Sequence, residues 1–389
     1  MVTQSYYPFL DRGGQAVTVR ALAQGLAGRG HRVTVLTADL SGGKRGDLGE
    51  RTEWGWDSRE QNVETVYLRT ALTFHALTVN PALGAFCRER LAGFDVVHLY
   101  GLYDLMGPKV SRLSQGAQIP YLLEPMGMFR PIDRAFFLKW LWRKIYGNRL
   151  LQDAWRIIAT SELEKGELIQ GGIAAERVLL RYNPVDRAEY ARLPARGTFR
   201  RQWKISGSEP LVLFLGRLIP RKGADLLIQA FADAMPGGGT LVIVGPEGNP
   251  GYVDQLRAVA RQSGVADRVR FTGGLYGEAQ KAVLADADIF ALPSSYENFA
   301  NAVAEAVASG VPVVVTDRCG IHSLVDGRAG LVVRRDRQAL AQALGELWSN
   351  RALMASLRAG CRAVAEELSV ERIVAQQEAF YASRPRRSS

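Results

Sequence analysis

The chain of 389 residues is 47% apolar and 23% charged, which is typical of a soluble globular protein and long enough for two or three domains. Its formal charge of +10 is compatible with nucleic acid or an anionic membrane, but no base-stacking motif or known DNA-binding module accompanies the charge, so we predict no nucleic-acid partner. Three scattered cysteines fit neither a disulfide framework nor a zinc site, and the lack of a signal peptide or a membrane-spanning run predicts a cytoplasmic protein.

Strands alternate with helical stretches through the first half of the chain. Residues 2–38 predict a βαβ unit with a glycine loop before its helix, and the helix is expected to bury a stripe of Val17, Leu22 and Leu26. Residues 41–62 are aperiodic and predict a mobile loop. Further strands are predicted at residues 95–99, 121–124, 155–161 and 177–181.

The periodicity breaks at residues 182–197, where proline and glycine accumulate, and this predicts a domain junction. Beyond the junction the alternation resumes, with strands at 211–216, 240–245, 268–273, 289–293, 313–316 and 331–333. The chain is therefore expected to be an α/β protein with two doubly wound, Rossmann-like domains. Ligands of such sheets bind beyond the carboxyl ends of the strands, which predicts binding in a cleft between the domains.

Two acids follow the strand at 289–293. Glu297 stands in a polar loop, and Glu305 is the only charge in the Ala/Val-rich helix that comes next. A carboxylate on such a helix is costly to bury without partners, so Glu305 is expected to reach water or a ligand. The start of the helix also offers backbone N–H groups that favour a phosphate. Two hydroxyl acceptors beside an anion site indicate a sugar nucleotide.

A basic turn follows the strand at 211–216. It carries Arg217, Arg221 and Lys222 just before a helix, and cations beside free helix N–H groups are suited to a diphosphate. A solvated basic loop is the alternative. The turn repeats the topology of the Glu297 segment within the same predicted sheet, so both turns should lie at one edge, and this favours the functional interpretation.

The motifs GRLIPRKG (216–223) and ENFANAVAEAVASGVPVV (297–314) together resemble those of glycosyltransferase family 4, whose members are retaining transferases with the two-domain GT-B fold. The resemblance covers almost the whole chain and includes DVVHLYGLYD (95–104) and TSELEKGELIQGGI (160–173). It implies a retaining, metal-independent hexosyltransferase that moves a sugar from a nucleoside diphosphate to a hydroxyl. No cofactor or metal is expected, and the nucleotide sugar is a substrate.

The resemblance also implies a domain plan. Residues 1–185 would form the acceptor-binding domain, 186–207 the linker and 208–370 the nucleotide-sugar-binding domain. Residues 371–389 would form a helix that crosses back to the first domain, and a tail.

The resemblance assigns roles to individual residues. Arg217 and Lys222 would neutralise the diphosphate, Glu297 would bind sugar hydroxyls near the reacting carbon, and Glu305 would bind the ribose diol. Catalysis is thereby expected from Glu297, Arg217 and Lys222. Further donor contacts are implied for the backbone N–H groups of Asn298, Phe299, Ala300, Gly13 and Gly14.

The chain departs from the family after the strand at 121–124. Many members have His-Gly there, with the His near the reacting centre, whereas this chain has Met126, which cannot hydrogen-bond in the same way. His98 and Glu124, at predicted strand ends, are the other acceptor-side candidates, and for His98 a structural hydrogen bond is an equal alternative. Asp286 and Asp288 form a D-x-D triplet, but the family has a similar acidic helix end without a metal.

Residues 129–156 mix seven basic residues with two acidic ones and three tryptophans. A helix of this kind can lie in a membrane interface, and the alternative is a helix packed on the core. Membrane contact would place the enzyme at the inner face of the plasma membrane and suit a lipid-linked or polysaccharide acceptor. Two other functions stay open: a catalytically silent nucleotide-sugar-binding homologue, which Met126 suggests, and a GT-B epimerase or phosphorylase.

Overall fold

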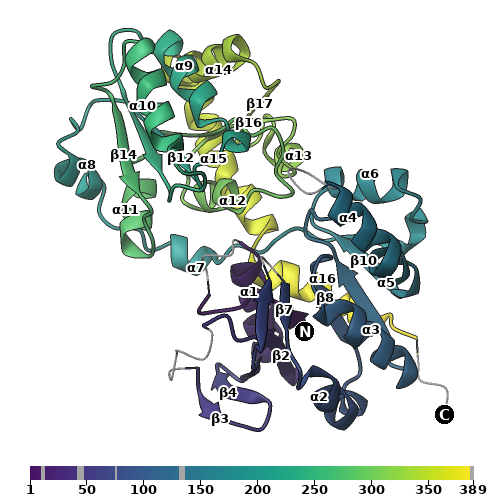
Figure 1. Cartoon of the computed structure of the whole chain (residues 1–389). Helices are drawn as coiled ribbons and strands as arrows, with labels where there is room; N and C mark the ends of the chain where they lie inside the picture. Colours follow the sequence, from purple (N-terminus) through teal and green to yellow (C-terminus); the bar gives the residue numbers. More distant parts are fainter. Residues whose placement is uncertain (10–13, 42–47, 75–76, 131–135, 386–389) are drawn as a thin grey trace. The chain divides into compact units, whose positions relative to one another are not determined.

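The computed structural model describes residues 1–9, 14–41, 48–74, 77–130 and 136–385 (Figure 1). The chain divides into two compact units: unit 1 comprises Met1–Pro184 with Val370–Ser389, and unit 2 comprises Val185–Ser369. Each unit is built on its own sheet, and the last helix in the sequence belongs to unit 1. The residues expected as a linker, 186–207, lie within unit 2 and contain two short helices.

Unit 1 contains a nine-stranded sheet whose strand order is β11-β10-β9-β8-β1-β2-β5-β4-β3. Neighbouring strands are parallel, except that β4 runs antiparallel to both β5 and β3. A separate antiparallel hairpin is formed by β6 and β7. The strands are β1 (Val2–Thr3), β2 (Val33–Ala38), β3 (Glu50–Arg51), β4 (Gly55–Glu60), β5 (Val63–Leu68), β6 (Leu72–Phe74), β7 (Leu77–Val79), β8 (Val97–Tyr100), β9 (Tyr121–Glu124), β10 (Arg156–Ala159) and β11 (Val178–Leu180).

The prediction of a mobile loop at residues 41–62 is wrong for the second half of this range, because β3 and β4 lie there. Residues 42–47 are outside the described residues. In β4 only Gly55 is buried, while the rest of the strand is partly or fully exposed. Strand β4 is held by backbone pairing with β5 on one side and β3 on the other and not by apolar side chains, so its sequence shows no apolar alternation. Strands β5, β6 and β7 were also not predicted.

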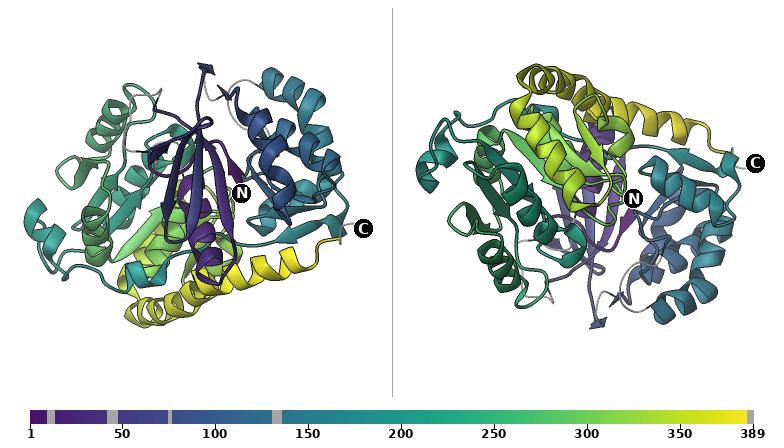
Figure 2. Two further views of the ribbon diagram at one scale, coloured as in Figure 1. Left: turned by 90° about the horizontal axis from the view of Figure 1, so that it is seen from below. Right: turned by 90° about the horizontal axis from the view of Figure 1, so that it is seen from above.

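The helices of unit 1 are α1 (Gln15–Gly28), α2 (Leu83–Arg90), α3 (Met106–Gly116), α4 (Phe136–Trp142), α5 (Asn148–Asp153), α6 (Glu162–Gln170) and α16 (Val370–Ala382), with a π-helical turn η3 (Arg143–Gly147) between α4 and α5. Helix α1 buries Leu22 and Leu26 as predicted, but Val17 is 51% exposed, and Ala16 and Val19 fill the buried face instead. Helix α16 packs beside α1, although the two are at opposite ends of the sequence (Figures 1 and 2).

Unit 2 contains a six-stranded, fully parallel sheet with the order β14-β13-β12-β15-β16-β17. The strands are β12 (Leu211–Leu215), β13 (Thr240–Val244), β14 (Val269–Gly273), β15 (Ile289–Leu292), β16 (Val313–Thr316) and β17 (Gly330–Val333). All six lie within or next to the predicted segments. Their near-continuous Val, Leu and Ile runs are buried, as expected for parallel strands covered on both faces.

The helices of unit 2 are α7 (Arg187–Tyr190), α8 (Thr198–Trp203), α9 (Ala224–Ala234), α10 (Tyr252–Gln262), α11 (Glu278–Asp286), α12 (Asn301–Ala308), α13 (His322–Val325), α14 (Arg337–Ser349) and α15 (Arg351–Glu367). Strand β12 lies between β13, which follows it in the sequence, and β15, on its other side. The direction of winding therefore reverses at β12 and β15. In open α/β sheets, ligands bind at the carboxyl ends of the strands at such a switch point.

Candidate active site

The switch point of unit 2 brings together the two turns that carry the predicted donor-binding residues. The first, Gly216–Gly223, follows β12, and the second, Pro293–Ala300, follows β15. Between them a backbone hydrogen bond runs from the Ser295 N–H to the Arg221 carbonyl at 2.9 Å. The two turns are therefore one connected structure at the carboxyl edge of the sheet.

Gly223 allows the close approach of these turns. Its φ is +74°, and a Cβ built there would lie far inside contact distance of the Pro293 carbonyl oxygen. Gly223 is also the N-cap residue of helix α9, and its left-handed conformation directs the end of the basic turn toward the second turn.

Lys222 and Glu297 form an ion pair across the two turns. The Lys222 Nζ lies 2.7 Å from Glu297 Oε1, and the two side chains are 16% and 13% exposed. The Ser294 hydroxyl donates to the same carboxylate oxygen at 3.4 Å. Both ends of the pair keep a small exposed surface, so each group can also face a ligand.

The Glu297 loop is braced by the segment that follows β16. The Glu297 N–H donates to the Arg318 carbonyl at 2.9 Å, and the Gly320 N–H donates to the Glu297 carbonyl at 2.9 Å. The Ile321 N–H donates to the Phe299 carbonyl at 3.1 Å. These contacts to the Glu297 loop were not predicted from the sequence. They could have been inferred, because residues 317–321 follow a parallel strand next to β15 and so must emerge at the same edge of the sheet.

Arg217 occupies the start of the basic turn and is exposed. No described residue forms a hydrogen bond or ion pair with its guanidinium. The turn is held by Leu218, whose N–H donates to the Pro246 carbonyl at 2.9 Å and whose carbonyl accepts from the Gly248 N–H at 3.0 Å. A Cβ on Gly248 would lie 2.7 Å from Arg217 Cγ, so glycine leaves room for this side chain. A free cation held on a fixed turn suits an anionic ligand.

The N-terminus of α12 is formed under backbone strain. Ala300 precedes the helix with φ +79° and ψ +69°, a left-handed conformation that is costly for a residue with a side chain. Phe299 and Ala300 are 2% and 7% exposed, and they anchor the segment on which Asn298 stands. The strained residue Ala300 lies in the segment whose backbone N–H groups are implied, by the resemblance, to contact phosphate and sugar.

Glu305 lies on α12 in a different environment from Glu297. The Gln280 side chain of α11 donates to Glu305 Oε2 at 2.7 Å. Burial, with the charge of Glu189 on α7 as a smaller cause, raises the pKa of Glu305 to about 7, against the opposing effect of the Gln280 hydrogen bond. One carboxylate oxygen is thus occupied and the acid is poised near neutrality. This environment suits hydrogen bonding with hydroxyl groups.

The acceptor-side candidates of unit 1 are in its interior. His98 is 1% exposed and Glu124 is 0% exposed. Arg181 binds both oxygens of Glu124 at 2.8 Å, and His98 Nδ1 is 2.8 Å from the Tyr381 hydroxyl of α16. His98 therefore makes a structural hydrogen bond, which was the alternative to a role in ligand binding. The expectation that these side chains face a ligand is corrected, since the network that ties α16 to the sheet encloses both of them.

Met126 and the glycine loop are the other unit 1 candidates. Met126 has φ +55° and is followed by Gly127 with φ +79°. The buried Glu164 carboxylate accepts from the Gly127 N–H at 2.6 Å, so this turn is fixed to α6. Gly14 begins helix α1, and Gly13 lies outside the described residues.

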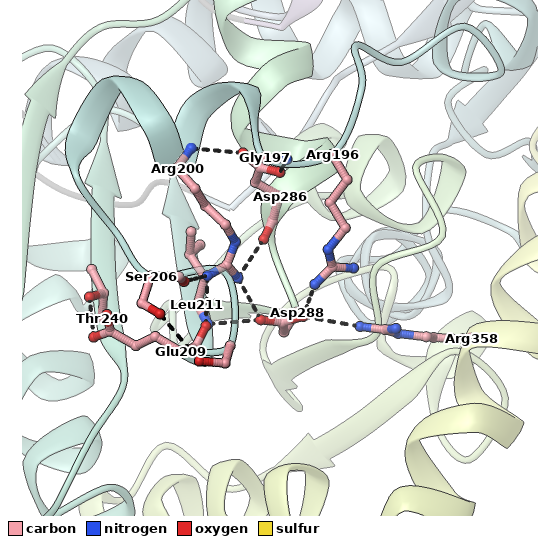
Figure 3. A network of polar contacts seen from close by, with 11 residues as sticks. Arg196, Gly197, Arg200, Ser206, Glu209, Leu211, Thr240, Asp286, Asp288 and Arg358 are labelled. Atoms are coloured by element: carbon pink, nitrogen blue, oxygen red, sulfur yellow. Dashed lines mark hydrogen bonds and ion pairs between the residues drawn. The ribbon is translucent and has the colours of Figure 1, made fainter.

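The D-x-D triplet has no free ligand set for a metal. Figure 3 shows that Asp286 accepts from the backbone N–H groups of Gly197 and Arg200, and that three guanidinium groups converge on Asp288. Arg200 contributes one of them at 2.8 Å, and Arg358 and Arg196 contribute the others. The triplet holds α8 to the sheet, because its carboxylates are saturated by cations and N–H groups.

Two protein-family models match the chain. The model described as Glycosyltransferase Family 4 matches residues 12–189, and the model described as Glycosyl transferases group 1 matches residues 209–350. The second match contains both turns of the switch point. The chain belongs to glycosyltransferase family 4. The first match spans the acceptor-side candidates, so family membership extends over both units.

Among curated relatives, the D-inositol 3-phosphate glycosyltransferase of Nocardia farcinica is 33% identical over 240 residues, which are 57% of this chain and 51% of that protein. A GDP-mannose-dependent α-(1-6)-phosphatidylinositol monomannoside mannosyltransferase of Mycobacterium tuberculosis is 38% identical over 168 residues, 40% of this chain and 43% of that protein. The chain thus spans about half the length of these relatives.

Among solved structures, Anabaena HepE in complex with UDP-glucose matches 98% of each chain with a TM-score of 0.76 and 21% sequence identity. This likeness shows the fold, which is the GT-B arrangement of two α/β domains with parallel sheets.

Proposed function

We propose that this family 4 protein is a retaining hexosyltransferase that moves a sugar from a nucleoside diphosphate to a hydroxyl. The observation that carries the proposal is the Lys222–Glu297 ion pair across the two turns of the unit 2 switch point. The pair places Lys222, a cation suited to binding a diphosphate, beside Glu297, a carboxylate suited to binding sugar hydroxyls. The HepE complex, whose ligand is UDP-glucose, supports a nucleotide-sugar donor.

In this proposal Arg217 and Lys222 neutralise the leaving diphosphate, a role that needs no metal. The resemblance implies front-side substitution, in which the leaving phosphate takes the proton of the acceptor hydroxyl as the new glycosidic bond forms on the same face. Glu297 orients the sugar near the reacting carbon, and Glu305 binds the ribose diol. Electrostatic stabilisation of the phosphate is then the main requirement, so Met126 in place of the family His is compatible with transfer.

The acceptor is proposed to be a lipid-linked or polysaccharide intermediate at the cytoplasmic face of the plasma membrane. The name of the M. tuberculosis relative includes a phosphatidylinositol monomannoside, which supports a lipid-linked acceptor. Segment 129–156 would contact the membrane. Unit 1 has a cavity of about 150 Å³ at the carboxyl ends of β1 and β8, its own switch point, and the lining includes the polar residues Gln15, Thr73, Thr78 and Asp104. We propose that this cavity takes the acceptor hydroxyl.

The test is a double-mutant cycle on the ion pair. Lys222→Ala and Glu297→Ala should each lower transfer by at least about 10²-fold, because each removes charge stabilisation or orientation at the reacting centre. The double variant should be little worse than either single variant, because the two groups act as a unit. Transfer is measured from a panel of nucleotide sugars chosen by thermal shift. A chelator should leave the rate unchanged.

The matched control is another ion pair of unit 2. Arg328 and Glu367 are 2.6 Å apart and belong to neither turn, so Arg328→Ala with Glu367→Ala should retain transfer. Full activity in Lys222→Ala or Glu297→Ala contradicts the proposal. Nucleotide binding without transfer to any acceptor indicates the silent homologue, and a sugar product formed without acceptor indicates an epimerase.

A further inference from the structure

Helix α4 and the turn η3 carry an exposed apolar stripe. The stripe consists of Phe137, Leu138, Trp140, Leu141, Ile145 and Tyr146, of which Phe137 is 67% exposed and Ile145 is 55% exposed. Only part of the segment packs inward: Trp142 donates through Nε1 to the Leu102 carbonyl at 3.0 Å, and Arg143 covers the Phe129 ring. A core-packed helix would bury its aromatic residues, so this surface is suited to an apolar partner.

A basic cavity of about 550 Å³ adjoins the stripe. Ile145 and Tyr146 belong to both, and the rest of the lining comes mainly from α3 and α5, with a contribution from α2. The charged residues in the lining are Arg88, Lys109, Arg112, Arg149 and Asp153.

The cavity has an excess of positive charge that the protein does not neutralise. Its one acid, Asp153, is 3.3 Å from Arg149. Arg88, Lys109 and Arg112 are exposed, and no described residue forms a hydrogen bond or ion pair with their charged groups. Lys109 and Arg112 are three residues apart on α3, so they share a face of the helix. Three unpaired cations around one cavity are suited to a phosphate group.

We propose that this cavity binds the headgroup phosphate of an anionic phospholipid while the stripe lies among the acyl chains. The occupant follows from the continuity of the two surfaces, since a phosphate site that opens onto exposed aromatic residues matches a molecule with an anionic head and an apolar tail. A soluble phosphate would leave the stripe uncovered. The proposal rests on the membrane contact of the proposed function and adds to it a ligand site outside both switch points.

The membrane site also has a place in the proposed reaction. Helix α3 starts at Met106, two residues after Asp104, which lines the proposed acceptor cavity of unit 1. The same helix carries Lys109 and Arg112. A membrane held by α3 and η3 would therefore present lipid-linked molecules close to the acceptor cavity.

The experiment is vesicle co-sedimentation of the full chain without any sugar donor. Vesicles of phosphatidylcholine alone are compared with vesicles that also contain phosphatidylglycerol. We expect the wild type to bind only the anionic vesicles. Lys109→Gln with Arg112→Gln should lower binding roughly 30-fold, about fivefold for each cation near an anionic leaflet. Trp140→Ser with Ile145→Ser should also weaken binding, because it removes the apolar contact.

The matched control removes two exposed cations elsewhere, Arg261→Gln on α10 with Arg362→Gln on α15. It changes net charge equally and should retain binding. Titration with short-chain phosphatidylglycerol should be saturable in the wild type and lost in the Lys109/Arg112 variant, whereas inorganic phosphate should not compete at equal concentration.

Several results overturn the proposal. They are unchanged binding in the Lys109/Arg112 variant, equal loss in the Arg261/Arg362 control, equal binding to neutral vesicles, or competition by inorganic phosphate. Because no transfer is measured, these results leave the Lys222–Glu297 test unaffected. Thermal unfolding of each variant in the absence of lipid checks that the fold is retained.

Discussion

Glu297 and Glu305 are spaced like a single motif, yet their surroundings differ. Glu297 is paired with Lys222, so its charge is compensated before any ligand arrives. No cation among the residues that the structure describes forms such a pair with Glu305, which accepts from the Gln280 side chain and lies near the like charge of Glu189. The first carboxylate therefore has a cation as its partner, while burial of the second raises its pKa, so that it holds its proton more tightly.

We expect Glu305→Gln to stabilise the protein at high pH. Because burial raises the pKa of Glu305 from 4.5 to about 7, the folded state binds this proton more tightly than the unfolded state. The resulting stability is fully present below pH 4.5 and is lost as the pH rises through 7. The variant does not titrate, so its gain in unfolding free energy over the wild type should grow by about 1–3 kcal/mol from pH 5 to pH 8.

Urea unfolding at the two pH values measures this gain. Glu346→Gln, which changes an exposed carboxylate on α14, is the control and should show no such growth. If the difference between Glu305→Gln and the wild type is the same at pH 5 and pH 8, burial does not raise the pKa of Glu305.

At the scale of elements, the site depends on how closely two strand-to-helix turns approach. The turn after β12 and the turn after β15 meet because Gly223 has no side chain. Gly251 has a similar φ of +77° and likewise begins a helix, α10, but a Cβ there would meet nothing within 4 Å. Comparing alanine substitutions at the two glycines therefore separates the free-energy cost of a left-handed backbone from the cost of a steric clash with the neighbouring turn.

Gly223→Ala is expected to destabilise unit 2 by about 2–4 kcal/mol, since it adds a clash with the Pro293 carbonyl to the backbone strain. Gly251→Ala should cost only about 1 kcal/mol, because it adds the backbone strain alone. Denaturant unfolding compares the two, and thermal shift with a nucleoside diphosphate should show weaker binding for Gly223→Ala only. Equal costs would mean that the two turns do not touch.

At the scale of the whole molecule, unit 1 is completed by the end of the chain. Helix α16 lies on α1, and its Ile373 and Val374 are 3% and 1% exposed within the same core cluster as Leu22. Gly25 of α1 permits this contact: a Cβ there would lie 2.5 Å from Val374 Cγ2 and 3.0 Å from Val370 Cγ1. The buried network around His98 and Tyr381 adds polar contacts from the same helix.

We expect Gly25→Ala to destabilise unit 1 by about 1–3 kcal/mol, although alanine is the better helix former, because the stiff valine side chains cannot move aside. Val374→Ala should make room, so the double variant should be more stable than the sum of the single changes by about 1 kcal/mol or more. Thermal and urea unfolding measure both.

Gly28→Ala is the control on the same helix, since its Cβ would meet nothing within 4 Å, and it should be neutral or stabilising. A stabilising Gly25→Ala would show that α16 does not pack on α1 as described.

In the part of the chain that the structure describes, every helix is too short or too polar to span a bilayer.

The sequence alone determined the α/β class and most strands of unit 2, because a buried parallel strand and an amphipathic helix leave local periodic patterns. It also placed Arg217, Lys222 and Glu297 in turns at strand ends and Glu305 in the helix that follows, and the order of these residues indicated a sugar nucleotide. Strand β4 escaped prediction because backbone pairing, and not apolar burial, holds it in the sheet.

Which polar groups meet depends on the three-dimensional fold. Lys222 pairs with Glu297 across two turns, three arginines saturate Asp288, and Glu124 is enclosed by Arg181. His98 meets Tyr381, 283 positions along the chain. Periodicity reports the burial of a residue relative to its sequence neighbours, whereas a charge is paired or left free by residues that the fold brings from far away. For that reason the sequence marked the candidate residues, and the fold separated those that can face a ligand from those that hold the elements of one unit in place.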